Sequence, residues 1–402
     1  MVSVEEAERI ILEHTKDYGA ELIPFESALG RMLAEDIYAD RDLPACDKST
    51  MDGIAIGYAA FEQGVRSFQI KGTIAAGDEP IEISNENECV EIMTGAALPG
   101  TADTVVRYED VAIENGVATI TIDAIKSGQN VHCKGRDRKK DNVVATANRV
   151  IDAALISMAA SVGKSLLLVK KLPRVVVIST GDELVDIAVQ PTAYQVRRSN
   201  SYMIRAALLQ YCISADMLHL PDDGDIAKEQ ITQCLEGYDV IIMSGGVSMG
   251  KFDYIPKALE DAGVTRLFHK VQQKPGKPFW FGCYEDSVLV FAFPGNPVST
   301  FLCLHRYFIP WLEGKLKVKS ERQKVCAVLN EGLTFLPQLQ YFVQVKIAVS
   351  DTGQLLATPM EGNGSGDFAN LLDTDAFMEL PMERGNFMKG EVYRIWPFKQ
   401  II

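Results

Sequence analysis

Two patterns of hydrophobic and polar positions divide the chain. From about residue 44 to residue 140, short runs such as SFQIKGTI and DTVVRYEDV alternate with Gly, Asn and Asp turns, which is typical of β-strands. Farther along, RVVVIS (174–179), DVIIMS (239–244) and VLVFAF (288–293) are continuous apolar runs, as expected for strands buried on both faces. Helical spacing lies between them, over 201–211, 225–237 and 254–262. This alternation predicts a doubly wound parallel sheet.

Other segments complete the expected fold. Ser3 and Glu6 predict a capping box for a helix over 3–16, and helical spacing recurs near 24–36 and over 151–163. After about residue 320, strand-like runs without a long helix predict a small β-barrel or sandwich. We therefore expect an α/β multidomain protein, in keeping with a length that favours two to four domains.

Composition excludes several classes of protein. A net charge of −14 argues against a general nucleic-acid binder, although a local cationic pocket can still hold a small anion. The acidic N-terminus does not look like a signal peptide, and the longest apolar runs are too short to span a membrane. The eight cysteines form no C-x-x-C pair, so we expect neither a zinc site nor a disulfide framework, and a reduced, cytoplasmic protein.

Each of the three apolar runs leads into a turn rich in glycine. These turns are Gly181-Asp182-Glu183, the Gly245–Gly250 segment and the Pro294–Ser299 segment. In a parallel sheet they share the carboxyl edge, where open α/β sheets bind ligands. Glycine also lets backbone N–H groups approach an anion. One such turn is usually only a tight turn, but three together predict a phosphate or nucleotide pocket.

Weaker candidates surround this edge. The segment Lys274-Pro275-Gly276-Lys277-Pro278 holds two cations on a stiff backbone, which favours a phosphate-facing loop over a solvated hairpin tip. Asn200 is either a binding residue or the cap of the helix that follows it. Asp222-Asp223 is either an acidic loop or part of the site. The basic run 134–140 is either a solvated charge run or an anion-contacting loop, and the five dispersed histidines form no ligand spacing.

The order of these motifs resembles a known family. STGDEL, SGGVSMGKFDY, KPGKPFWFG and FPGNPVS follow one another as in the molybdopterin molybdenumtransferases, the family of bacterial MoeA and the E domain of gephyrin. Upstream, DKSTMDGIAI, EIMTGAALPGTADTVVRYED and SGQNVHCKGRD are similar to further elements of that family. The resemblance covers roughly residues 5–400.

The resemblance implies a specific domain arrangement. It comprises a β-rich domain, an elongated connector, a sheet domain of the molybdopterin-binding type and a C-terminal β-barrel. In this chain we expect an N-terminal helix over 1–26 that packs with the sheet domain, the connector over 27–43 and 141–168, the β-rich domain over 44–140, the sheet domain over 169–320 and the barrel over 321–402.

The resemblance also implies a reaction, in which adenylyl-molybdopterin and molybdate give molybdenum cofactor and AMP. Cleavage of a phosphoanhydride calls for Mg²⁺ and lysines to neutralise charge. The expected metal-holding carboxylates are Asp182, Glu183, Asp223 and Asp253. The expected substrate-binding residues are Gly181, Asn200, Gly245, Gly246, Ser248, Gly250, Lys274, Gly276, Lys277, Pro294, Gly295, Asn296, Pro297 and Ser299.

Similar proteins are elongated homodimers, with an active site between the sheet domain of one subunit and the β-rich domain of the other. Asp52, Thr94 and Asp137 are expected to close this chain's site from the partner copy. The resemblance also implies a molybdopterin adenylyltransferase as a partner protein; nucleic acid and membrane are not expected.

The chain departs from the family pattern at two places. Arg136 stands where members usually have glutamate, and an arginine near YFVQVKI is replaced by Gln344 or Lys346, while the turn Gly364-Ser365-Gly366 is retained. Arg136 is a candidate for an extra anion contact. Two other functions stay open: a molybdopterin adenylyltransferase, which normally lacks the β-rich insertion and the barrel, and a non-catalytic binding or scaffold protein.

Overall fold

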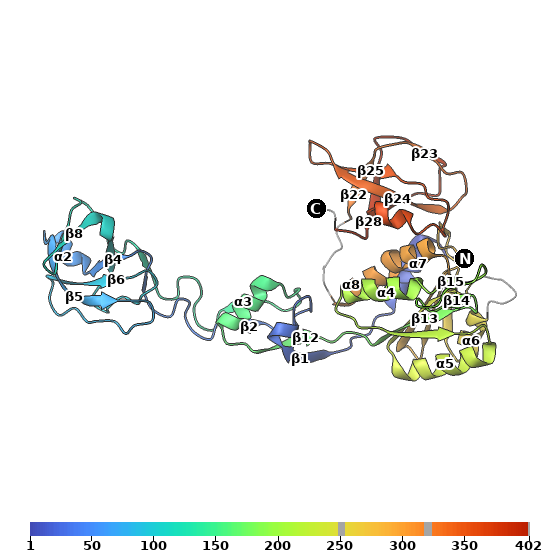
Figure 1. Ribbon diagram of the computed structural model, residues 1–402, viewed down its shortest axis with the longest axis horizontal. Coiled ribbons are helices and arrows are strands. Elements are labelled where there is room, and N and C mark those ends of the chain that lie inside the picture. The colour runs from blue at the N-terminus through green and yellow to red at the C-terminus, as the bar shows by residue number, and fades with distance from the viewer. Residues whose placement is uncertain (248–253, 317–323, 401–402) are drawn as a thin grey trace.

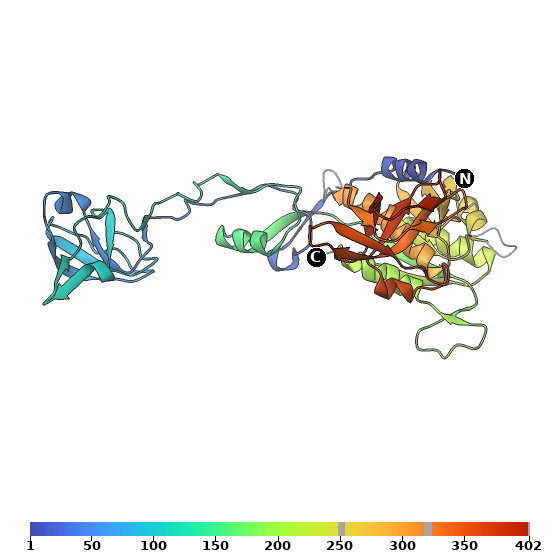
Figure 2. The same cartoon turned by 90° about the horizontal axis from the view of Figure 1, so that it is seen from above.

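The computed structural model describes residues 1–247, 254–316 and 324–400 of the 402-residue chain. It is elongated, with three parts along its length (Figure 1). A β-rich domain lies at one end, a connector built around α3 (Ala153–Ser161) lies in the middle, and an α/β sheet domain with a β-barrel beside it forms the other end. The view from above shows the same separation, with two chain segments joining the β-rich domain to the connector (Figure 2).

The β-rich domain is built on one six-stranded sheet, as its alternating pattern predicts. The strand order is β7-β4-β6-β5-β9-β8. Ile54, Phe68 and Val106 are fully buried in its core. The elements are β3 (Lys48–Ser49), β4 (Gly53–Ile56), α2 (Tyr58–Glu62), β5 (Ser67–Ile74), β6 (Glu88–Ile92), β7 (Thr104–Arg107), η2 (Tyr108–Asp110), β8 (Val111–Glu114), β9 (Val117–Ile120) and β10 (Val131–His132), of which β10 pairs with β3.

The connector holds two short antiparallel pairs and one helix. β1 (Ala20–Pro24) pairs with β12 (Leu166–Lys170), and β2 (Ile37–Tyr38) pairs with β11 (Val143–Ala145). Helix α3 begins where Asp152 Oδ1 accepts the N–H of Leu155 at 2.8 Å. It ends before Gly163, whose φ of +71° suits a residue without a side chain. The expected helix over 151–163 is therefore confirmed.

The prediction of a helix near 24–36 is wrong. Only the 3₁₀ turn η1 (Phe25–Ser27) forms there. Met32 and Leu33 lie in isolated bridges with Val150 and Val169. Ala28 and Leu33 are buried because they pack against α3 and β12, whereas Leu29 is exposed. The helix-like spacing therefore reflects the connector's own core and not a helical face.

The sheet domain has the doubly wound form that the apolar runs predict. Its strand order is β16 (Asp216–Leu220), β13 (Val175–Thr180), β17 (Val240–Ser244), β21 (Val288–Phe293), β20 (Trp280–Tyr284) and β18 (Thr265–His269). The first four strands are parallel, β20 runs antiparallel to β21, and β18 runs antiparallel to β20. The sheet is therefore mixed and not wholly parallel.

Helices cover both faces of this sheet. On β13, Val175 and Val177 join one apolar core and Val176 and Ile178 join another, as the two-residue period of a strand requires. Helices α5 (Gly224–Gly237) and α6 (Ile255–Asp261) cover one face. The other is covered by α4 (Asn200–Leu209), α7 (Pro297–Cys303), the π-helical turn η3 (Leu304–Phe308), α8 (Ile309–Leu316) and α1 (Val4–Glu13).

Helix α1 confirms the predicted N-terminal helix. Ser3 Oγ accepts the N–H of Glu6 at 3.1 Å, which is half of the expected capping box. Val4, Ala7 and Ile11 are buried in the same core as Val175. The first residues of the chain thus belong to the sheet domain, although the connector and the β-rich domain separate the two in sequence.

The C-terminal domain is a closed barrel, which decides between the barrel and sandwich alternatives. Its strands run β24-β25-β22-β28-β26, and β26 pairs back to β24. β19 (Gln273–Lys274), from the sheet domain, joins β24 in parallel. The remaining elements are β22 (Cys326–Leu329), β23 (Leu333–Thr334), β24 (Gln340–Val349), β25 (Leu355–Pro359), α9 (Asn370–Asp373), β26 (Ala376–Leu380), β27 (Asn386–Phe387) and β28 (Val392–Pro397).

A buried arginine links this barrel to the sheet domain. Arg306, on η3, is 1% exposed. Its Nη2 lies 2.9 Å from Glu8 Oε2 on α1 and 3.8 Å from Glu379 Oε1 on β26. Its guanidinium lies 4.1 Å from the ring centre of Trp396. The side chain of Arg306, from η3, therefore contacts both α1 and the wall of the barrel.

All eight cysteines are free. Among the described residues, none of the helices combines the length and the apolar character that a membrane crossing requires.

Candidate functional site

The three glycine-rich turns lie at one edge of the sheet, as the sequence predicts. Ser179 on β13 is in register with Ser244 on β17, and Ser244 is in register with Phe293 on β21. Because the three strands are parallel, the turns after them leave the sheet side by side. The Gly245 N–H donates to Phe293 O at 3.2 Å, which ties the second turn to the third strand.

Gly245 and Gly246 allow a close approach between two of these turns. A Cβ added at Gly245 would lie 2.9 Å from both the carbonyl oxygen and Oγ1 of Thr180, and the φ of Gly245 is +102°. A Cβ at Gly246 would lie 2.8 Å from Thr180 Oγ1. A Cβ at Gly295 would lie 3.5 Å from Gly245 Cα. The second turn thus packs so closely against Thr180 that Gly245 and Gly246 have no room for a side chain, whereas the contact at Gly295 is an ordinary one. Turns without side chains are the kind that lets backbone N–H groups approach an anion.

Asn200 holds the second and third turns together. Its Nδ2 donates to Ser244 Oγ at 2.8 Å, to Gly295 O at 2.7 Å and to Thr300 Oγ1 at 3.3 Å. The interpretation of Asn200 as a cap of the following helix is wrong, because α4 begins at Asn200 itself and Ser199 occupies the cap position without a side-chain bond. From the first position of α4 its amide instead bonds to the end of β17 and to the turn after β21.

Two buried polar atoms at this edge have no hydrogen-bond partner in the described part of the chain. They are Thr180 Oγ1 and Asn200 Oδ1. Thr180 is 4% exposed and lies beneath the Gly245–Gly246 turn. Buried polar groups are nearly always paired, so unpaired ones at a crevice are consistent with a ligand that supplies the partner.

The first turn is fixed by a reciprocal pair of aspartates. The Asp182 N–H donates to Asp222 Oδ2 at 3.3 Å, and the Asp222 N–H donates to Asp182 Oδ1 at 3.1 Å. Gly181 has a φ of +127°, and a Cβ there would lie 2.4 Å from Glu183 Oε2. The turn after β13 and the turn after β16 therefore present Asp182, Glu183 and Asp222 together.

Asp223 is engaged differently from its neighbours. Its Oδ1 accepts the N–H groups of Asp225 and Ile226, each at 3.0 Å, so it caps α5. Ser248, Gly250 and Asp253 lie outside the described residues. Within residues 1–247, 254–316 and 324–400, no group of three or more His, Cys, Asp or Glu side chains is placed to hold a metal ion.

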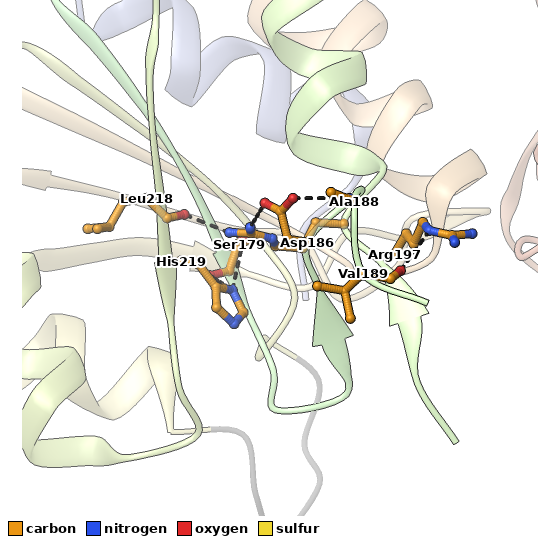
Figure 3. A network of polar contacts seen from close by, with 8 residues as sticks. Ser179, Asp186, Ala188, Val189, Arg197, Leu218 and His219 are labelled. Atoms are coloured by element: carbon orange, nitrogen blue, oxygen red, sulfur yellow. Dashed lines mark hydrogen bonds and ion pairs between the residues drawn. The ribbon is translucent and has the colours of Figure 1, made fainter. Parts of the chain in front are cut away.

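A polar network supports the first turn from beneath (Figure 3). Ser179 Oγ lies 3.0 Å from His219 Nδ1 on the neighbouring strand. Burial lowers the pKa of His219, and the Arg198 guanidinium acts in the same direction. Asp186 accepts the N–H of Ala188 at 3.1 Å and forms an ion pair with Arg198. This network steadies the segment that carries β14 (Leu184–Val185) and β15 (Val196–Arg197).

The segment 274–278, named here the lysine loop, is not a free hairpin tip. β19 contains Lys274 and pairs with Gln340–Tyr341 of the barrel. The Lys274–Pro275 peptide bond is cis. Lys274 Nζ lies 5.3 Å from the ring centre of Phe335, also in the barrel. The loop is therefore held between the sheet domain and the barrel.

A cavity of about 620 Å³ lies beside the lysine loop. Lys274 and Lys277 line one side of it, and Gln344 and Ser365 line it from the barrel. Gln344 is 8% exposed, and in the described part of the chain its Oε1 has no hydrogen-bond partner. Two lysine ammonium groups and a buried amide with an unpaired oxygen therefore line the same cavity.

The third turn forms another wall of the same cavity. Pro294, Asn296 and Ser299 line it. Asn296 Nδ2 donates to Ser365 Oγ at 2.7 Å, and the Val298 N–H donates to Ser365 O at 3.1 Å. Pro297 is the first residue of α7, and Ser299 is buried within that helix. The barrel and the third turn are thus joined directly through Ser365.

Sequence reasoning did not find the aromatic wall of this cavity. Phe335 and Tyr341 line it and stack on each other, with ring centres 4.1 Å apart. No local signal distinguishes them, because both lie in ordinary strand-like barrel sequence and meet the lysine loop only through long-range pairing.

The residues expected from the β-rich domain form two pairs there. Asp52 Oδ1 accepts the Thr94 N–H at 2.6 Å and the Thr94 hydroxyl at 2.8 Å. The backbone hydrogen bond from Thr94, with the hydroxyl, lowers the pKa of Asp52. Asp137 Oδ1 lies 3.0 Å from His132 Nε2. Asp52 precedes β4, Thr94 follows β6 and Asp137 follows β10. The domain of β4 and β6 lies at the opposite end of the molecule from the sheet domain (Figure 1), so one chain does not bring the two sets together.

Three family models match the chain in sequence order. Residues 2–163 match the MoeA N-terminal region (domain I and II), residues 176–314 match a probable molybdopterin binding domain, and residues 327–398 match the MoeA C-terminal region (domain IV).

Known proteins are similar over almost the whole chain. A molybdopterin molybdenumtransferase from Synechocystis sp. is 37% identical over 396 residues, covering 98% of this chain and 99% of its own. One from Staphylococcus aureus is 30% identical, covering 98% of this chain and 95% of its own. The crystal structure of the molybdopterin biosynthesis MoeA protein from Pyrococcus horikosii superimposes with a TM-score of 0.85 at 28% identity, over 100% of both chains.

Proposed function

The chain belongs to the MoeA family of molybdopterin molybdenumtransferases, and from this membership we propose that it inserts molybdate into adenylyl-molybdopterin and releases AMP. It is thus an enzyme of molybdenum cofactor biosynthesis. The observation that carries the proposed reaction is the cavity beside the lysine loop, in which two cations and an unpaired amide meet a wall formed by the third glycine-rich turn.

The lysine loop suits an oxyanion. Lys274 and Lys277 supply positive charge, and Gln344 and Ser365 supply neutral polar groups on the opposite wall. Ammonium groups held close to a developing negative charge stabilise it most where the surroundings exclude water. Molybdate and the phosphates of adenylyl-molybdopterin are the anions that the proposed reaction brings there.

The glycine-rich edge suits the phosphoanhydride. At Gly181, Gly245 and Gly246 a side chain would clash or strain the turn, so the backbone of this edge carries no side chain there. Thr180 Oγ1 and Asn200 Oδ1 need partners that a nucleotide or a pterin offers. Pro294, Asn296, Pro297 and Ser299 connect this edge to the cavity, which lets one ligand extend across both.

The carboxylates suit Mg²⁺ in number. Magnesium is usually held by one or two carboxylates together with waters and phosphate oxygens. Asp182 and Glu183, beside Asp222, meet that requirement without a larger cluster. Asp223 has one carboxylate oxygen committed to α5, so we assign the metal first to Asp182 and Glu183, and with them Asp253. When bound, Mg²⁺ neutralises charge on the phosphates.

The reaction itself is tested with the full chain. Adenylyl-molybdopterin, molybdate and Mg²⁺ should give AMP, measured by chromatography, without consumption of ATP. Lys277→Ala and Glu183→Gln should each lower the rate by about 100-fold or more. Lys257→Ala, an exposed lysine of α6 that does not line the cavity, should leave it unchanged. Consumption of ATP would identify an adenylyltransferase, and ligand binding without AMP release would identify a binding protein; either result rejects the proposal.

We also propose that two copies form each site. The β-rich domain, which holds Asp52, Thr94 and Asp137, lies at the far end of the molecule from the sheet domain, so a homodimer that crosses the two copies would bring these residues to the glycine-rich edge. Mixing the inactive variants Asp52→Asn and Glu183→Gln should restore activity, because half of the dimers formed would contain one intact site. The expected rate is about one quarter of the wild-type rate. No recovery after subunit exchange would contradict a shared site.

The location of the protein and its partner protein are two further parts of the proposal. We propose a cytoplasmic location, supported by eight free cysteines, and a molybdopterin adenylyltransferase as the protein that supplies the substrate. Co-purification of the two proteins from cell extract would test the second point.

A further inference from the structure

A buried polar cluster lies directly behind the lysine loop. It consists of Gln273, Cys303 and Tyr307, of which Gln273 and Cys303 are 0% exposed and Tyr307 is 2% exposed. The Tyr307 hydroxyl donates a short hydrogen bond to Gln273 Oε1. Gln273 Nε2 donates to Gly276 O at 3.4 Å and to Cys303 Sγ at 3.8 Å. Gln273 lines the cavity, whereas Tyr307 and Cys303 do not.

The cluster acts on the turn of the loop. Gly276 O accepts from Gln273 Nε2 and, at 3.9 Å, from Cys303 Sγ. Gly276 has a φ of +85°, and a Cβ there would lie 2.7 Å from Gln273 Nε2 and 3.0 Å from Cys303 Sγ. Since Gly276 stands between Lys274 and Lys277, the position of its peptide sets the course of the backbone that carries both ammonium groups.

The hydroxyl of Tyr307 fixes the orientation of the Gln273 amide. An amide side chain can turn over so that oxygen and nitrogen exchange places, and its neighbours decide which way it lies. A donor at Tyr307 requires the oxygen to face Tyr307, which directs Nε2 to Gly276 O. Burial raises the pKa of Tyr307, so the hydroxyl keeps its proton and remains a donor.

Tyr307 is itself held by the junction of two domains. It lies on η3 next to Arg306, which contacts Glu8 and Glu379. Its ring packs against Phe279, with ring centres 5.1 Å apart. The same short turn thus contacts the barrel through one residue and the lysine loop through the next.

From these contacts we propose that Tyr307 is a positioning residue for the oxyanion site, acting through Gln273 to hold the Gly276 peptide and with it Lys274 and Lys277. This inference rests on the proposed function, which brings the oxyanion to the lysine loop. Tyr307 does not touch substrate in this role. It determines where the two ammonium groups stand before substrate arrives.

The test compares Tyr307→Phe, Gln273→Met and the double variant in the full chain. Tyr393→Phe is the matched control, because its hydroxyl donates to Glu391 Oε2 at 2.5 Å in the barrel and it does not line the cavity. Two readouts are needed. One is hydrogen exchange of the backbone over residues 271–279 without ligand, and the other is the molybdate concentration that gives half-maximal AMP release.

Loss of one buried hydrogen bond should raise exchange in the loop and raise the molybdate KM by about tenfold, with a smaller change in kcat. The double variant should show the same exchange and the same molybdate KM as the single variants, because both substitutions break the same connection from Tyr307 through Gln273 to Gly276. The control should change neither readout, even if it lowers the melting temperature equally. A rescue of the wild-type exchange pattern in Tyr307→Phe by high molybdate would agree with the same picture.

Two results would overturn the inference. Wild-type exchange and wild-type molybdate KM in Tyr307→Phe would show that the hydroxyl does not position the loop. Effects of Tyr307→Phe and Gln273→Met that multiply in the double variant would show that the residues act independently. Failure of the proposed function looks different, since the wild-type protein would then release no AMP while the exchange comparison could still be read.

Discussion

Arg306 Nη2 lies 2.9 Å from Glu8 Oε2, and this contact joins the first helix of the chain to the π-helical turn of the sheet domain. Arg306 is 1% exposed, and Glu379 of the barrel lies 3.8 Å away. Glu379 also accepts the Trp396 Nε1–H at 2.7 Å. A single buried cation therefore compensates carboxylates from two elements that the sequence places far apart.

Replacement of Arg306 by methionine should destabilise the protein strongly. The change keeps much of the side-chain volume but leaves Glu8 and the nearly buried Glu379 without their cation. Breaking a buried ion pair in this way typically costs about 3–5 kcal/mol. Urea unfolding monitored by tryptophan fluorescence gives the free energy of unfolding. On the neighbouring helix face, Arg9→Met removes an exposed pair with Glu13 and should cost less than about 0.5 kcal/mol. Equal losses in the two variants would contradict this assignment.

Gly245→Ala should damage the glycine-rich edge. The new Cβ would lie 2.9 Å from Thr180 O on a residue whose φ is +102°. The backbone conformation alone should cost about 1–3 kcal/mol, and displacement of the turn should lower AMP release further. Gly314→Ala, on α8, meets no atom within 4 Å and should be neutral or slightly stabilising. Thermal unfolding and the AMP assay measure both variants, and a Gly245→Ala protein with wild-type stability would show that the turn tolerates a side chain.

Thr94→Val should raise the pKa of Asp52. The variant keeps the Thr94 N–H bond to Asp52 and removes the hydroxyl bond, so the pKa should move part of the way back toward its ordinary value. Because the folded-state pKa is lowered, this contact stabilises the domain above the unfolded pKa of Asp52 and is lost as pH falls. NMR titration of the carboxyl carbon measures the shift. Thr73→Val, which removes a hydroxyl bond to Glu91, is the control and should not move Asp52.

His219→Gln should make stability less dependent on pH. The pKa of His219 lies below its usual 6.5 because the ring is buried and Arg198 is near. A lowered folded-state pKa means that the contribution of His219 is complete above the unfolded pKa and is lost as pH falls. Urea unfolding at about pH 7.5 and about pH 5.5 should therefore show a smaller difference in the variant than in the wild-type protein. An unchanged difference would mean that His219 is not responsible.

Much of the sheet domain could be predicted because its signals are local. Continuous runs such as Val175–Ile178 must be buried on both faces, and the glycines after them must turn, so the shared edge follows from the sequence without knowledge of the fold. The capping of α1 by Ser3 is equally local. These features depend on residues only a few positions apart.

What escaped prediction depends on contacts between distant residues. The lysine loop is held by a barrel strand through the pairing of Lys274 with Tyr341, which no local pattern reveals. Asparagine is a residue type that often caps helices, yet Asn200 binds Gly295 O because the fold brings the third turn to it. Around Leu33, tertiary packing gave helix-like spacing to a stretch that is not helical. In each case the deciding partner lies elsewhere in the chain.

The placement of α1 has a consequence for synthesis on the ribosome. Val4, Ala7 and Ile11 are buried only against residues such as Val175 and Phe291, which emerge after the whole connector and the β-rich domain. The β-rich domain has its own hydrophobic core and can fold as soon as its last strand leaves the ribosomal exit tunnel. During that interval the apolar face of α1 is exposed to solvent. In a nascent chain stalled before residue 175, α1 should therefore bind chaperones although the β-rich domain has already folded.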